Sequence, residues 1–121
     1  MMKLMQGLHD NVLGIVGSGT ITREDYDTVL IPAIHEKLKK YKKIRILYQL
    51  DKNYVHYELG VFLEDAKVTW HTFSFEKVAV VSDVHWIKDG VNFYKLFMPM
   101  PIKVFSNNEI EKAKEWISEL T

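Results

Sequence analysis

Short apolar runs separated by turn residues mark the beginning of the chain. The runs Lys3–Leu8 and Val12–Val16 flank Asp10-Asn11, and both residues of this pair tolerate the backbone conformations of tight turns. Gly17-Ser18-Gly19 follows the second run, and glycine-rich backbone favours an exit from a strand over its continuation. The pattern therefore predicts an opening hairpin of two strands.

From Thr22 onward, apolar side chains recur every three or four residues, which is the period of an amphipathic helix. The apolar stripe consists of Tyr26, Leu30, Ile34, Leu38 and Tyr41. Thr22 and Asp25 have the spacing of a capping box at the start of this helix. Pro32 lacks a backbone donor and clashes with the carbonyl of Thr28, so we expect a kink or a restart of the helix there.

The rest of the chain alternates between apolar, β-branched runs and further helical patterns. Strands are predicted over Ile44–Leu50, Lys77–Ser82 and Ile102–Phe105. Helices are predicted over about Val55–His71, over Trp86–Phe97, and from Ile110 after a capping box in Ser106–Glu109. The order β-β-α-β-α-β-α-β-α predicts an α/β fold with a mostly parallel five-stranded sheet and one antiparallel edge strand.

Composition and charge narrow the class of protein further. The 121 residues include 16 Lys+Arg and 16 Asp+Glu, and this balance argues against general binding of nucleic acid. The chain has no cysteine, which excludes disulfides and thiolate metal ligands and is consistent with a reducing cytoplasm. It has neither an export-type N-terminus nor an apolar run near the roughly 18 residues that span a bilayer. We therefore expect a single cytoplasmic domain over residues 1–121, with no transmembrane segment.

Several segments resemble the SpoIIAA-like family of small bacterial proteins. They are Ile21–Ala33, Lys43–Leu47, Phe75–Asp83 with Trp86, and Ala113–Trp116. The family is similar to STAS domains and, more distantly, to the lipid-binding CRAL-TRIO fold, which implies one sheet built from β-α units. STAS relatives that antagonise anti-sigma factors use a phosphorylatable serine at the start of the helix after the third strand. The corresponding loop here, Asp51–Tyr57, contains no Ser or Thr, so the resemblance does not extend to that phosphoswitch.

Polar residues follow three of the predicted strands, at the edge where ligands bind in open α/β sheets. The candidate rim consists of Ser18, Asp51, Asn53, Tyr54, His56, Tyr57, Asp83, His85 and Trp86. Its Asp and His side chains are suited to general acid–base catalysis or to a divalent metal. However, aspartates at strand–helix junctions are more often turn or cap residues, and the histidines lack the spacing of a compact ligand set. We therefore predict no catalytic residue, no metal site and no cofactor.

One basic cluster lies at the end of the first predicted helix. Its members are Lys37, Lys39, Lys40, Lys42, Lys43 and Arg45. Cations complement the dipole at a helix C-terminus, so a solvated helix end is the simplest interpretation. The alternative is a patch for an anionic lipid or a nucleic acid.

Apolar side chains in predicted loops suggest a surface for a partner, because they are harder to bury than those in helices and strands. The candidate partner surface consists of Phe73, Phe75, Phe97, Met98 and Met100. The leading hypothesis is a non-enzymatic STAS-like module that binds a protein partner or a second copy of itself. The first alternative is a carrier of a small apolar or lipid-like ligand held between the two middle helices. The second is an enzyme that uses Asp51, His56, Asp83 and His85.

Overall fold

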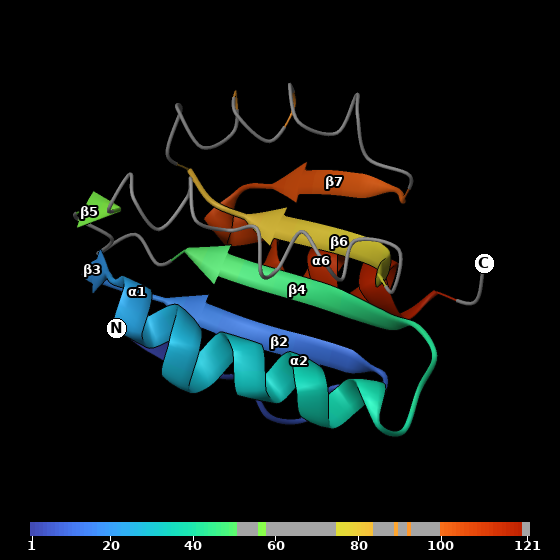
Figure 1. The fold of residues 1–121 in the computed structure, drawn as a ribbon. Coiled ribbons are helices and arrows are strands. Elements are labelled where there is room, and N and C mark those ends of the chain that lie inside the picture. The colour runs from blue at the N-terminus through green and yellow to red at the C-terminus, as the bar shows by residue number, and fades with distance from the viewer. Residues whose placement is uncertain (51–55, 58–74, 84–88, 90–91, 93–99, 120–121) are drawn as a thin grey trace.

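A five-stranded sheet forms the centre of the computed structural model (Figure 1). Its strands are, in spatial order, β1 (Met2–Leu4), β2 (Val12–Gly17), β4 (Ile44–Leu50), β6 (Phe75–Val81) and β7 (Ile102–Phe105). β1 is antiparallel to β2, and the other neighbouring strands are parallel. The structure describes residues 1–50, 56–57, 75–83, 89, 92 and 100–119. The predicted α/β class, the mostly parallel sheet and its antiparallel edge strand are confirmed.

The first helical segment restarts at its proline, as expected. α1 (Arg23–Asp25) leads into a π-helical turn over Tyr26–Leu30 and then into α2 (Ile31–Leu38). Pro32 lies in the first turn of α2, where a backbone N–H would have no intrahelical partner. The irregular turn lies immediately before it, so the lost donor is accommodated at a junction rather than inside a regular helix.

The first strand is shorter than the predicted range Lys3–Leu8. The chain leaves the sheet after β1 and turns at Gly7, whose φ of 80° favours glycine. Met5 and Leu8 then fold back over Gly14 in β2, where an added Cβ would collide with both side chains. Glycine at position 14 therefore makes room for this return of the chain.

The helix predicted over about Val55–His71 does not begin where the pattern placed it. Residues His56–Tyr57 form β5, which pairs in parallel with β3 (Thr20–Ile21) in a separate two-stranded sheet. Pairing with a distant segment has overridden the local helical pattern at these two residues. The remainder of that helix, from residue 58, lies outside the described residues. Within the range Trp86–Phe97 the structure describes only positions 89 and 92, both helical.

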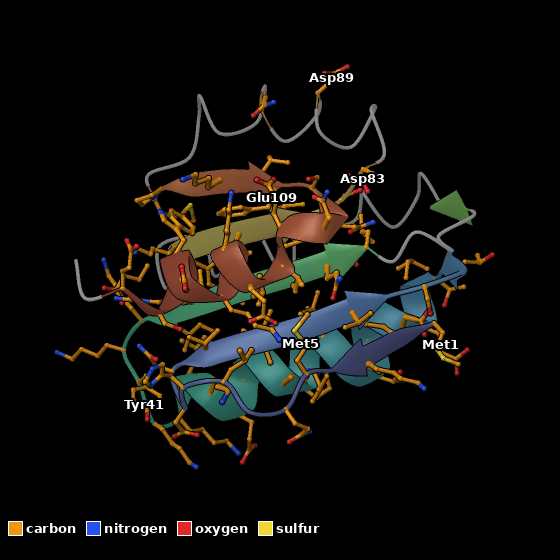
Figure 2. The ribbon with its side chains drawn as sticks, turned by 180° about the vertical axis from the view of Figure 1, so that it is seen from behind. Met1, Met5, Tyr41, Asp83, Asp89 and Glu109 are labelled. Carbon is orange, nitrogen blue, oxygen red and sulfur yellow. The ribbon has the colours of Figure 1, made fainter. Side chains whose placement is uncertain are left out.

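Helices cover both faces of the sheet (Figures 1 and 2). α2 packs on one face, where Ile34 is buried in the larger of two apolar clusters. α6 (Ile110–Ser118) covers the other face and follows a 3-10 turn over Asn107–Glu109. The smaller cluster beneath α6 consists of Val12, Leu47, Ala79, Val81, Phe105, Ala113 and Ile117. The two clusters are separate because alternate side chains of each strand point to opposite faces.

Candidate functional site

The carboxyl ends of the central strands meet at one edge of the sheet, as the rim hypothesis requires. Gly17 at the end of β2 pairs with Leu50 at the end of β4, and β4 lies parallel to β6. Ser18 and Asp83, which follow β2 and β6, therefore lie at the same edge. The rim residues Asp51, Asn53, Tyr54, His85 and Trp86 lie outside the described residues, and the backbone of His56 and Tyr57 belongs to β5.

Asp83 caps the turn that leads into α6. Its Oδ1 accepts a hydrogen bond of 3.2 Å from the backbone N–H of Asn107, at the start of the 3-10 turn. Figure 2 shows Asp83 close to this end of α6, on the same side as Glu109. This contact agrees with the interpretation of the aspartate as a cap residue. It gives no support to a shared acid–base site.

Ser18 is held through its backbone at the start of the chain. Its N–H donates to the carbonyl of Met1 at 2.8 Å, and the Met1 ammonium donates to the carbonyls of Ser18 and Thr20 at 2.7 and 2.6 Å. The same ammonium lies 3.6 Å from Oδ2 of Asp25. Asp25 in turn accepts from the N–H of Thr22 at 2.9 Å, which confirms the first predicted capping box. These contacts bring β1, the loop after β2 and the start of α1 together at one corner.

Two members of the predicted partner surface are buried and must be removed from it. Phe75 is the first residue of β6, opposite Ile44, and Met100 lies in the same large apolar cluster. Their exposed fractions are 9% and 8%. The prediction treated Phe75 as a loop residue because it placed the beginning of this strand at Lys77. The other members, Phe73, Phe97 and Met98, lie outside the described residues.

Among the described residues, the large apolar side chains that are exposed are Met1 and Leu4, at 56% and 45%. Leu4 belongs to the edge strand β1, and Met1 adjoins it. Sequence reasoning missed this site, although Leu4 in a short strand at the edge of the sheet was a usable signal. The two residues give β1 an apolar character that an edge strand usually avoids.

The backbone of β1 is also open on its outer side. The N–H of Met5 donates to Gly14 at 2.8 Å, and Met1 accepts from Ser18, so the odd-numbered residues face β2. In an antiparallel pair the intervening residues direct their peptide groups the other way. The N–H and C=O groups of Met2 and Leu4 therefore point outward from the edge. This arrangement can accept one more strand.

The basic cluster and an exposed polar contact lie where β2 and β4 begin, at the other end of these strands from the rim. The Tyr41 hydroxyl donates to Oδ2 of Asp10 at 2.8 Å, and Lys37 Nζ donates to the Asp10 carbonyl at 2.6 Å. The hydrogen bond from Tyr41, followed by the charge of Lys40, lowers the pKa of the Asp10 carboxyl. The same hydrogen bond raises the pKa of Tyr41. Arg45 does not share the solvent exposure of the cluster, because it is buried in β4.

The part of the chain that the structure describes contains neither a metal-ligand group nor a membrane-spanning helix. Its His, Asp and Glu side chains form no group of three or more that is placed to hold a metal ion. Of its helices, none has both the length and the apolar character needed to cross a bilayer. The ligand-carrier alternative concerns the two middle helices, which lie almost entirely outside the described residues.

Comparison with known proteins identifies the family. The SpoIIAA-like family model matches residues 12–118, so this chain belongs to the SpoIIAA-like family. A solved structure of an uncharacterised protein with a SpoIIAA-like fold from Shewanella loihica PV-4 superposes with a TM-score of 0.72. It is 22% identical and covers 97% of this chain and 92% of its own, which shows a shared fold. None of the curated proteins matches the chain.

Proposed function

We propose that this chain is a non-enzymatic, cytoplasmic, single-domain module that acts by binding a protein through strand β1. The observation that carries the proposal is the combination of exposed Met1 and Leu4 with the outward peptide groups of Met2 and Leu4. Membership of the SpoIIAA-like family supports a small module of this kind. The lack of Ser and Thr in the loop Asp51–Tyr57 is a reason to leave the serine phosphoswitch out of the proposal.

Addition of a strand to β1 is the binding mode that this geometry favours. In such complexes the main-chain hydrogen bonds provide affinity and the alternate side chains provide specificity. Lys3 is exposed between Met2 and Leu4, and a charge in the middle of an edge strand discourages indiscriminate pairing. A partner strand is therefore expected to place an apolar residue beside Leu4 and to avoid a cation opposite Lys3.

A second copy of the chain is the partner that is tested most directly. Two copies of β1 related by a two-fold axis would pair antiparallel. Centring this pairing on Leu4 places the two Leu4 side chains together and separates the two Lys3 side chains. Centring it on Lys3 would place like charges opposite each other, which is unfavourable.

Sedimentation velocity over a concentration series tests the proposal on the full chain. We expect the wild type to form dimers as its concentration rises, and we expect Leu4→Lys to remain monomeric at the same concentrations. Asn92→Lys, which introduces the same charge at an exposed helical position outside β1, serves as the control and should dimerise like the wild type. A second arm uses the three chains as bait for partner proteins, and binding should be lost only with Leu4→Lys. Identical behaviour of all three chains in both arms would refute the role of β1.

A further inference from the structure

Two buried cations lie side by side on the sheet beneath the C-terminal end of α6. Arg45 in β4 and Lys77 in β6 are direct neighbours in the parallel register. Their exposed fractions are 5% and 4%, which is rare for such side chains unless each has a partner. The arrangement is independent of the β1 edge and of the proposed function.

Both cations bind main-chain carbonyls of α6. Arg45 Nη1 donates to the carbonyls of Ile117 at 2.7 Å and Glu119 at 2.5 Å. Lys77 Nζ donates to the carbonyl of Trp116 at 3.0 Å. The last carbonyls of a helix lack intrahelical partners and carry the negative end of its dipole, so cations are favourable there. The end of α6 is therefore fastened through its backbone.

Among the described residues, the counter-charge for the two cations comes from one partly exposed carboxylate. Arg45 Nη2 lies 3.3 Å from Oε1 of Glu76, whose side chain is 37% exposed. One partly solvated carboxylate thus faces two buried cations. Lys77 Nζ also lies 4.8 Å from the centroid of the Trp116 ring, so this tryptophan reports on whether the contact is formed. Both cations would regain hydration if α6 moved away, and this gain offsets part of the loss of their hydrogen bonds.

The two ends of α6 are held by different polar contacts, and its apolar side chains pack on the smaller of the two clusters. At its beginning, Asp83 binds Asn107, and Glu109 Oε1 accepts from the N–H of Ser106 at 2.9 Å. Along the helix, Ala113 and Ile117 are fully buried, and Ile110 and Trp116 pack against the same smaller cluster. The larger apolar cluster, on the other face of the sheet, contains no residue of α6.

We infer that α6 is a strap that opens from its C-terminal end while the sheet and α2 remain folded. Arg45 and Lys77 act as the fastening, and the capped beginning of α6 acts as the fixed end. Opening uncovers the apolar strip formed by Leu47, Ala79 and Val81, with the two cations at its edge. Local opening of this kind is expected where a segment can leave without exposing the larger of the two apolar clusters.

Native-state hydrogen exchange measured by NMR at increasing, sub-denaturing urea tests this inference on the wild-type chain. We expect the amides of residues 114–118 to exchange faster than those of β4, with a weaker dependence on urea, because a local opening exposes little surface. If the amides of α6 and β4 exchange through one common opening with the same urea dependence, the inference that α6 opens as a strap is wrong. This measurement needs no variant.

Two matched substitutions then test the fastening. Lys77→Met keeps the length of the side chain and removes its charge, and we expect exchange within α6 to accelerate about tenfold or more, with a shift of the Trp116 side-chain N–H resonance. Lys103→Met makes the same change on β7, where the lysine contacts the Phe105 ring and no carbonyl of α6. This control should leave exchange in α6 within about twofold of the wild type. Equal acceleration of exchange by the two substitutions would show that Lys77 does not hold the end of α6.

Discussion

α2 and α6 cover opposite faces of one sheet and follow a similar plan, but their C-terminal ends are attached in different ways. The segment that leads into α2 begins with the Thr22–Asp25 capping box, and α6 follows the box in Ser106–Glu109. α2 ends at an exposed contact between Tyr41 and Asp10. α6 ends on buried Arg45 and Lys77. The comparison shows that polar contacts can attach the end of a helix to either face of the sheet. The contact is exposed for α2 and buried for α6.

The difference follows from what each helix has beneath it. Ile34 of α2 is buried in a cluster that extends over all five strands of the central sheet, so α2 packs on the larger part of the core. Under α6 the strands β4 and β6 supply cations at one end and the apolar side chains of Leu47, Ala79 and Val81 elsewhere. Attachment on the α6 face therefore combines apolar packing with charged contacts to the backbone. These contacts are replaceable by water, whereas apolar burial is not.

The largest effect is expected when the apolar anchor of each helix is truncated. Ile34 and Ile117 have exposed fractions of 0%. Each change to alanine should lower the free energy of unfolding by about 2–5 kcal/mol in urea denaturation, because it leaves a cavity. For Ile117→Ala, the Trp116 side-chain N–H resonance should change before the far-UV circular dichroism transition. For Ile34→Ala the two signals should coincide, and an early change of the Trp116 resonance there would contradict the comparison.

The next effect concerns the beginnings of the two helices, where the comparison predicts similarity. The Asp25 N–H donates to Thr22 Oγ1 at 3.2 Å, and Ser106 Oγ donates to Glu109 Oε1 at 3.0 Å. Thr22→Ala and Ser106→Ala should each lower the free energy of unfolding by about 1 kcal/mol. Urea denaturation measures both, with Thr20→Ala at an exposed strand position as the control. A lower free energy of unfolding in only one of the two variants would show that the two capping boxes are not equivalent.

The smallest effect is a pH dependence of the exposed attachment of α2. The pKa of Asp10 is lowered in the folded state, so its contribution is present above its ordinary value of 3.8 and is lost as pH falls through the folded-state pKa. The pKa of Tyr41 is raised, so its contribution is lost as pH rises above its ordinary value of 10.0. An NMR titration of the Asp10 carboxyl should therefore show a midpoint below 3.8 in the wild type.

The control for this titration is Tyr41→Phe, which removes the hydroxyl and keeps the ring. The midpoint of Asp10 should move up toward its ordinary value, since the hydrogen bond from Tyr41 is the main cause of the lowered pKa. An unchanged midpoint in Tyr41→Phe would instead assign the shift to the neighbouring lysines.

Much of the fold was predictable because its signals are local. The apolar run Ile44–Leu50 became β4 with the predicted bounds, and Pro32 marked the start of a helix. The first strand was too long in the prediction, because Leu8 packs over Gly14 instead of continuing the ladder. β5 was missed because only its pairing with residues far away in the sequence makes it a strand.

The candidate site was less predictable than the fold. Asp83 was recognised as a polar residue at the correct edge, but its bond to Asn107 depends on where β7 brings the chain back. Phe75 was assigned to a loop, although the register with Ile44 buries it. The apolar edge at Leu4 depends on β1 being the outermost strand, and strand order in a sheet is a property of the whole molecule.

The sequence by itself determined the α/β class, the direction of the strands and the positions of both capping boxes. Periodicity, turn residues and caps act within a few residues of each other, so they can be read along the chain. Only the tertiary structure decided that Arg45 and Lys77 lie side by side under the end of α6. Their burial depends on contacts between residues that are 72 and 39 positions apart, and no local sequence pattern predicts such contacts.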